Sequence, residues 1–250
     1  MDAADARAGS DEVAVLIPAA GRGRRLGGRP KQFRVLGEHP VLVQVLLSFE
    51  RHPAVGHAVV AAPKDRVAEV TDRVRAEGLG VLTAVVGGGD NRQASVRHAL
   101  RAVPDPVNRV LVHDAARPFV AAAQVTAVLQ AVRTDGAASL AVPVADTLRR
   151  GDGDRFGDTV SREDLHRMQT PQGFRRQWLE QAHRHASSAD VTATDDVALV
   201  QRMDHDVVPV AGSRRNFKIT TPDDWMLAQQ LWPAWKDAPE RFRLSSSAST

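Results

Sequence analysis

Residues 18–33 read PAAGRGRRLGGRPKQF and directly follow the apolar run VAVLI, which is typical of a strand. Four glycines and five cations therefore lie at the turn after this predicted strand. Glycines let the backbone approach an anion closely, the backbone N–H groups then point at the anion, and cations neutralise it. The stretch predicts a phosphate-binding turn, with a mobile glycine loop and solvated arginines as the alternative.

Two common phosphate-binding motifs do not fit this turn. Leu26 stands where the dinucleotide fingerprint needs its third glycine, and Arg29-Pro30 follow Gly28 where a P-loop needs Lys-Ser or Lys-Thr. What remains is Gly-x-Gly-x-Arg followed by Pro-Lys, which offers backbone donors and two fixed cations, Arg25 and Lys31. This layout suits a nucleoside triphosphate that loses its outer two phosphates. Only four of the 33 basic residues are lysines, so Lys31 indicates a need for a compact point charge.

Polar residues also follow two later predicted strands. Asp114 comes directly after the predicted buried strand at 110–113, at the edge where open sheets bind ligands, and a carboxylate there can hold Mg²⁺. Alternatively, Asp114 caps the next helix and pairs with Arg117. Asp90 and Ser95 lie in GGGDNRQAS, where Asp90 can accept a hydrogen bond from the amino group of a base. Asp90 can also cap the helix that follows, and the two roles can coexist.

Composition limits the class of protein. The chain has 250 residues, which suit one domain or one domain with an appendage, and it has no cysteine for disulfides or zinc thiolates. Its start is polar and no apolar run reaches membrane-spanning length, so we expect a cytoplasmic protein with no membrane partner. The pI of about 9.9 reflects missing Cys and Tyr rather than strong charge, since the net charge is only +3. We therefore expect no nucleic-acid partner.

The elements that must position these residues alternate along the chain. Strands are predicted at 13–17, 57–62, 81–86, 110–113 and 138–144, with helices at 41–50, 65–77, 92–102 and 120–133. This alternation favours an α/β fold with a Rossmann-like, doubly wound and mostly parallel sheet.

The later part of the chain departs from this alternation. The polar insertion at about 146–164, ADTLRRGDGDRFGDTVSRED with its flanks, predicts a projecting hairpin or a flexible loop. FKITTPDDW predicts a strand at 217–220 and then a helix that Thr221 caps. A single domain is expected over 12–235, with flexible tails at 1–11 and 236–250.

The glycine-rich stretch, followed in order by HDAARPF, TPQGF and NFKITTPDDW, resembles the signature of the 2-C-methyl-D-erythritol 4-phosphate cytidylyltransferases of the non-mevalonate isoprenoid pathway. The resemblance spans about 13–231. It implies a β-arm that interlocks a homodimer, CTP and a polyol phosphate as substrates, and Mg²⁺ or a similar divalent cation as cofactor. A related enzyme acting on ribitol 5-phosphate is the nearest alternative. A nucleotide-binding regulatory module without turnover is the alternative from another class.

The resemblance also implies residue roles. The implied catalytic residues are Arg25, Lys31, Arg162 and Lys218. The implied nucleotide-binding residues are Ala19, Ala20, Gly21, Gly23, Gly89, Asp90, Ser95 and Asp114, with Asp114 also the metal ligand. The implied acceptor-binding residues are Arg117, Thr147, Arg162, Thr170, Thr194 and Lys218, of which Thr147 and Arg162 would reach a partner's pocket from the arm. Arg215 stands where the family often has an acidic residue, so that position offers no second carboxylate for the metal.

Overall fold

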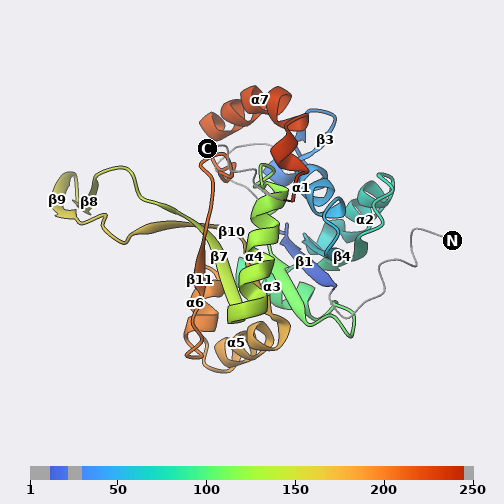
Figure 1. The fold of residues 1–250 in the computed structure, drawn as a ribbon, viewed down its shortest axis with the longest axis horizontal. Coiled ribbons are helices and arrows are strands. Elements are labelled where there is room, and N and C mark those ends of the chain that lie inside the picture. Colours follow the sequence, from blue (N-terminus) through green and yellow to red (C-terminus); the bar gives the residue numbers. More distant parts are fainter. Residues whose placement is uncertain (1–11, 22–29, 245–250) are drawn as a thin grey trace.

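The structure is a computed structural model, which we describe for residues 12–21 and 30–244. A sheet lies at its centre (Figure 1). The sheet has seven strands in the order β11-β7-β10-β6-β1-β4-β5. Strand β10 runs antiparallel to β6 and β7, whereas the other neighbouring pairs are parallel. The sheet is therefore the doubly wound, mostly parallel α/β sheet that the sequence predicts. Its strands are β1 (Val13–Pro18), β4 (Val55–Ala62), β5 (Leu82–Gly87), β6 (Arg109–Val112), β7 (Ala137–Pro143), β10 (His166–Arg175) and β11 (Val208–Ala211).

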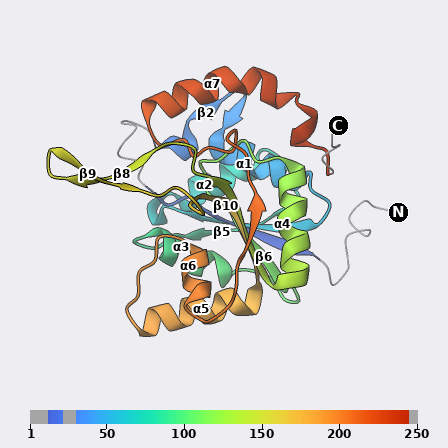
Figure 2. The same ribbon diagram turned by 60° about the vertical axis from the view of Figure 1, so that its left-hand side comes forward.

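Helices cover both faces of the sheet, because successive side chains of a strand point to opposite sides. In β1, Val15 and Ile17 pack under α1, α2 and α4, whereas Leu16 packs under α3, α5 and α6. The two hydrophobic clusters give three layers, which Figure 2 shows with the sheet seen between helices. None of the described helices is long and apolar enough to cross a membrane. The covering helices are α1 (Val41–Glu50), α2 (Val67–Arg75), α3 (Arg92–Leu100), α4 (Ala122–Asp135), α5 (Arg176–Ser188) and α6 (Asp196–Gln201).

The strand order places four loops at one edge of the sheet. From β1 the chain moves to β4 and β5 on one side and then to β6 on the other side of β1. Open α/β sheets bind ligands where the strand order reverses, outside the carboxyl ends of the strands. The loops after β1, β4, β5 and β6 meet there, and they carry Ala19, Lys64, Asp90 and Asp114.

Two predicted elements differ in the structure. The helix expected at 65–77 is a short 3₁₀ turn (Lys64–Arg66) followed by α2, because Arg66 has a non-helical φ of −126°. The prediction of a strand at 217–220 is wrong, since no described strand pairs with this segment. Its N–H groups are used elsewhere: Ile219 donates to the Ala116 carbonyl at 2.9 Å and Thr220 donates to Asp224 Oδ2 at 2.8 Å.

The polar insertion is a hairpin rather than a flexible loop. Strands β8 (Leu148–Asp152) and β9 (Arg155–Val160) form a two-stranded antiparallel sheet that projects from the body (Figure 1). Gly153 has a φ of 60° in the turn between them, a conformation that glycine adopts without steric cost. Phe156 in β9 is 85% exposed, so the hairpin has an apolar side chain that nothing in the described chain covers.

Helix α7 (Pro222–Lys236) covers the body beside the short strands β2 (Val35–Leu36) and β3 (His39–Pro40). Thr221 caps it as predicted, since its side chain accepts from the Asp224 N–H. A 3₁₀ turn (Pro239–Arg241) follows, and Arg241 is buried and donates to Gln44 Oε1 at 3.1 Å. In the described residues, the predicted tail at 236–250 thus begins with the last residue of α7 and this turn.

Candidate active site

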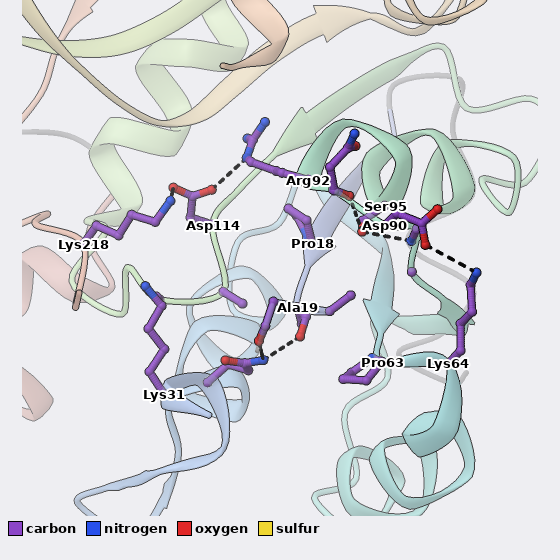
Figure 3. A pocket seen from close by; sticks show the side chains of 18 of the residues that line it. Pro18, Ala19, Lys31, Pro63, Lys64, Asp90, Arg92, Ser95, Asp114 and Lys218 are labelled. Carbon is purple, nitrogen blue, oxygen red and sulfur yellow. Dashed lines mark hydrogen bonds and ion pairs between the residues drawn. The ribbon is translucent and has the colours of Figure 1, made fainter. Parts of the chain in front are cut away.

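A pocket of about 660 Å³ opens at the carboxyl ends of β1, β4, β5 and β6 (Figure 3). Segments far apart in the sequence form its walls: the loop after β1, the turn after β4, the start of α3, the loop after β6 and the segment before α7. Nine of the predicted site residues line this one pocket, namely Ala19, Ala20, Gly21, Lys31, Gly89, Asp90, Ser95, Asp114 and Lys218. Gly23 and Arg25 lie outside the described residues.

Gln32 holds the loop that follows β1. Its side chain is buried, and its Nε2 donates to the Ala19 carbonyl at 2.7 Å and to the Gly21 carbonyl at 2.8 Å. With both carbonyls bound by Gln32, the backbone between them has a fixed course along the pocket wall. The neighbouring Lys31 points its amino group toward the side of the pocket where Asp114 and Lys218 lie (Figure 3). Gln32 was not singled out from the sequence, although it stands in the quoted PKQF motif.

The loop after β5 requires glycine where it passes the loop after β1. A Cβ on Gly88 would lie 2.3 Å from the Ala20 Cβ, and one on Gly89 would lie 2.3 Å from the Ala94 Cβ. The Ser95 hydroxyl accepts from the Gly89 N–H at 3.1 Å and donates to the Asn91 carbonyl at 2.9 Å. Ser95 therefore fixes the backbone of this corner of the pocket.

Asn91, and not its neighbour Asp90, caps helix α3. The Asn91 side chain accepts from the Ala94 N–H at 2.8 Å and caps α3. The Asp90 carboxylate is fully exposed at the pocket rim, with Lys64 Nζ at 3.9 Å. Lys64 is one of only four lysines in the sequence. Its position at the pocket, however, could be found only from the structure.

Asp114 lies in the floor of the pocket among three cations. Its carboxylate is 3.0 Å from Lys218 Nζ, 3.1 Å from Arg92 Nε and 3.3 Å from Arg117 Nε. Burial alone would raise the pKa of Asp114, but the charges of Lys218, Arg92 and Arg117 outweigh burial and lower the pKa far below its ordinary value. Asp114 is therefore ionised. Arg92 was not singled out, since an arginine at a helix start carries no signal of its own.

Thr170 and His113 hold the backbone of Asp114 in place through hydrogen bonds. The Asp114 N–H donates to Thr170 Oγ1 at 3.0 Å, and Thr170 Oγ1 lies 3.1 Å from His113 Nδ1. His113 Nε2 faces the Arg117 carbonyl at 3.0 Å, so Nε2 carries the proton and Nδ1 accepts from Thr170. Burial lowers the pKa of His113 to about 4, which keeps it neutral. The Thr170 hydroxyl, predicted to bind the acceptor, is thus used inside the fold.

Apart from Lys218, the other predicted acceptor residues lie outside the pocket lining. Arg117 lies behind Asp114, where its Nη1 donates to the Asn216 carbonyl at 2.8 Å. Thr147 and Arg162 are exposed at the base of the hairpin, and Arg162 donates to the Ala145 carbonyl. Thr194 is exposed just before α6, whose N-cap is Asp195. Within one chain, the structure does not bring Thr147, Arg162 and Thr194 to the pocket.

The donor set suits a metal that arrives with phosphates. The described residues contain no group of three or more His, Cys, Asp and Glu side chains that could hold a metal ion. Mg²⁺ commonly takes only one or two carboxylates and completes its octahedron with waters and substrate phosphates. Asp114 alone can meet that need, but it is already paired with three cations. The pocket therefore fits a magnesium–triphosphate complex better than a metal bound by protein alone.

Comparisons with known proteins agree with this geometry. The family model of IspD, 2-C-methyl-D-erythritol 4-phosphate cytidylyltransferase, matches residues 13–232. A protein of Salinibacter ruber with that enzyme name is 82% identical over 95% of this chain and 100% of its own length. One of Deinococcus radiodurans is 43% identical over 89% of this chain and 90% of its own. A crystal structure of the Thermus thermophilus enzyme superposes with a TM-score of 0.77 at 39% identity, covering 89% of this chain and 99% of the other.

These matches span the sheet, the hairpin and the residues of the pocket. They extend from the strand before the glycine-rich turn to the helix that Thr221 caps. The chain belongs to the 2-C-methyl-D-erythritol 4-phosphate cytidylyltransferase (IspD) family.

Proposed function

We infer that this chain transfers the cytidylyl group of CTP to 2-C-methyl-D-erythritol 4-phosphate and releases pyrophosphate. One observation supports this inference most strongly. A single pocket at the reversal of strand order combines a rim formed by the loops after β1 and β5 with the cations Lys31, Lys218 and Arg92 around Asp114. The rim suits a nucleotide, and the cations suit a reaction in which negative charge accumulates on phosphorus and on the leaving group. Family membership supplies the identity of the nucleotide and of the acceptor.

The reaction needs positioning and charge rather than covalent catalysis. An oxygen of the acceptor phosphate attacks the α-phosphorus of CTP in line, the new P–O bond forms, and the bond to the β-phosphate oxygen breaks. Lys31 would stabilise the negative charge that develops on the transferring and departing phosphates. Lys218, which contacts Asp114 at 3.0 Å, would orient the attacking phosphate. Arg25 would complete the group of catalytic cations.

The base would bind at the rim formed by the loops after β1 and β5. The backbone of Ala19, Ala20 and Gly89 lines this part of the pocket, and Asp90 and Ser95 flank it. A carboxylate or carbonyl there can accept from the amino group of cytosine, which uracil lacks. The site would therefore select CTP over UTP.

The divalent cation would be held by Asp114 and the phosphates of CTP. When bound there, Mg²⁺ would supply positive charge that offsets the negative charge developing on the phosphates during the transfer. Because Lys218, Arg92 and Arg117 already neutralise Asp114, the triphosphate would supply most of the attraction for the metal.

The acceptor site would be completed by a second subunit. Thr147 and Arg162 are exposed at the hairpin base and do not line the pocket of their own chain. A homodimer in which each hairpin reaches the partner's pocket would bring these two residues to the acceptor. Thr194, which lies just before α6, would be the third such residue. The cytoplasmic location predicted from the sequence belongs to this proposal, because the reaction consumes CTP from the cell interior.

An acceptor assay tests the proposed function. The purified chain with CTP and Mg²⁺ should release pyrophosphate in the presence of 2-C-methyl-D-erythritol 4-phosphate, and much more slowly with ribitol 5-phosphate. A preference for ribitol 5-phosphate would assign the alternative acceptor. CTP binding without release of pyrophosphate from CTP in the presence of either acceptor would contradict the function and favour a binding module.

A further inference from the structure

Arg92, the first residue of α3, joins two carboxylates from distant parts of the chain. Its Nε donates to Asp114 Oδ1 at 3.1 Å, and its Nη1 donates to Asp196 Oδ2 at 2.6 Å. Asp114 lines the pocket, whereas Asp196 begins α6 and is not among the lining residues. Figure 3 shows Arg92 on the pocket wall with its side chain directed at Asp114. Arg92 thus connects the pocket to the helical layer behind it.

Both oxygens of Asp196 are engaged. Asp196 is 0% exposed, its Oδ2 accepts from Arg92, and its Oδ1 lies 2.9 Å from His183 Nε2 of α5. Burial alone would raise the pKa of Asp196, but the Arg92 charge and the hydrogen bond from His183 outweigh burial and lower it. An ionised carboxylate at this depth is stable only when its charge is paired and its oxygens are hydrogen-bonded.

The protonation of His183 follows from this contact. Because an ionised carboxylate can only accept, His183 Nε2 carries the ring proton and donates it to Asp196. His183 Nδ1 is buried without a hydrogen-bond partner among the described residues, which an unprotonated nitrogen tolerates better than an N–H group. The His183 ring is therefore suited to a carboxylate at position 196. If a hydrogen-bond donor stood there instead, Nε2 would have to accept, and the ring proton would lie on the buried, unpaired Nδ1.

We propose that Asp196, held by His183, is a positioning residue that acts on the reacting phosphates through Arg92. The inference rests on the proposed cytidylyl transfer. A guanidinium group can form two parallel hydrogen bonds to one carboxylate. Asp196 takes Nη1, so Arg92 meets Asp114 through Nε at a longer distance. Without Asp196, Arg92 can turn and pair with both oxygens of Asp114, which would then be less available to the metal and to Lys218.

The replacement Asp196→Asn tests the charge with little change in size. An amide has a donor nitrogen in place of one of the two carboxylate oxygens, so it cannot accept from Arg92 at one position and from His183 at the other. We expect kcat/KM for CTP to fall at least about tenfold, the equivalent of ~1.4 kcal/mol, and Mg²⁺-dependent CTP binding measured by calorimetry to weaken. Wild-type values of both quantities would overturn the proposal.

A control variant separates positioning from folding. Leu199→Ala removes a buried side chain of the same helix α6 that packs in the apolar cluster under α3, α5 and α6. It should lower Tm at least as much as Asp196→Asn while leaving kcat/KM for CTP close to the wild-type value. If Leu199→Ala reduces kcat/KM as much as Asp196→Asn, then Asp196 contributes only to the stability of α6 and the proposal is wrong.

A double-mutant cycle tests whether Asp196 acts through Arg92. We expect the variant with both Arg92→Gln and Asp196→Asn to have the kcat/KM and CTP affinity of Arg92→Gln alone, since the two residues form one unit. Additive losses would show that Asp196 acts by another route. The wild-type chain is measured in parallel: if it releases no pyrophosphate, the proposed function fails, whereas the cycle in CTP affinity still decides the role of Asp196.

Discussion

The chemistry at the residue scale turns on one buried carboxylate among several cations. Asp114 contacts Lys218, Arg92 and Arg117 within 3.0–3.3 Å, so the free pocket is neutral or positive where a metal would bind. A triphosphate brings negative charge to the same place and changes that balance. The metal, the nucleotide and Asp114 should therefore bind as one unit.

The first prediction concerns this unit. Activity should require Mg²⁺ or a similar hard cation, and Asp114→Asn should reduce kcat at least about a hundredfold, because a metal supplies several kcal/mol of charge stabilisation. Calorimetry should detect Mg²⁺ binding in the presence of CTP and far weaker binding in its absence. Asp223→Asn removes an exposed carboxylate at the start of α7 and should leave kcat unchanged. A rate that survives EDTA would give Asp114 a structural role only.

The second prediction concerns Lys31. Its amino group points into the pocket toward Asp114 and Lys218 (Figure 3). Lys31→Ala should lower kcat by a factor of about 10²–10³, typical of losing one donor to a developing oxyanion, while CTP binding changes much less. Lys236→Ala is the control, since this lysine is half-exposed at the end of α7. If kcat stays near the wild-type value and only KM rises, Lys31 binds the ground state instead.

At the scale of elements, the sequence predicted what local rules determine. Helix α1 has the predicted bounds, and the Thr221 cap follows from Thr-Pro-Asp-Asp at a helix start. The segment 217–220 has the composition of a strand. In the folded chain, however, its N–H groups donate to the carbonyl of Ala116 in the loop after β6 and to the Asp224 side chain at the start of α7. The same limit applies in the site. Asp114 follows a strand and was predictable, whereas Asp196 is linked to it through Arg92 only because α6 packs against α5 and α5 packs against α3.

The third prediction concerns the junction of α1, β4 and α4, where His52 is buried. His52 Nδ1 accepts from the Ala54 N–H at 3.3 Å, and Nε2 lies 3.0 Å from Thr126 Oγ1. Burial lowers its pKa from 6.5 to about 4. Between these values the unfolded chain binds more protons than the folded chain, so stability falls as the pH drops from about 6.5 to about 4 and is fully present above 6.5.

Thermal unfolding of His52→Gln measures this contribution. The replacement can keep one hydrogen bond at the junction but cannot take up a proton. Its stability should therefore be lower than wild type at pH 7 and should decline less between pH 6.5 and pH 4, by up to about 3 kcal/mol. Parallel pH profiles of the two proteins would mean that His52 does not titrate in this range.

The whole molecule raises the question of what covers the hairpin. Its two strands project from the body, Phe156 is 85% exposed, and an isolated two-stranded ribbon is marginal in water. A two-fold homodimer is the commonest way to supply a partner surface. The arginines and aspartates of β8 and β9 suit a polar contact that is complementary to its own copy. If the hairpin also completes the acceptor site, the active unit is the dimer.

The fourth prediction is that subunits share active sites. Lys31 lies in the pocket of its own chain, and Arg162 would serve the partner's pocket, so Lys31→Ala and Arg162→Ala are each expected to be inactive. In a mixed dimer one site receives both changes and the other receives neither. With random exchange about half of the dimers are mixed and half of their sites are intact, so activity should recover to roughly a quarter of wild type. The mixture must first be shown to have exchanged, for example by mass spectrometry of tagged subunits. No recovery after verified exchange would mean that Arg162 acts within its own chain, and the hairpin would then hold the dimer together without completing the site.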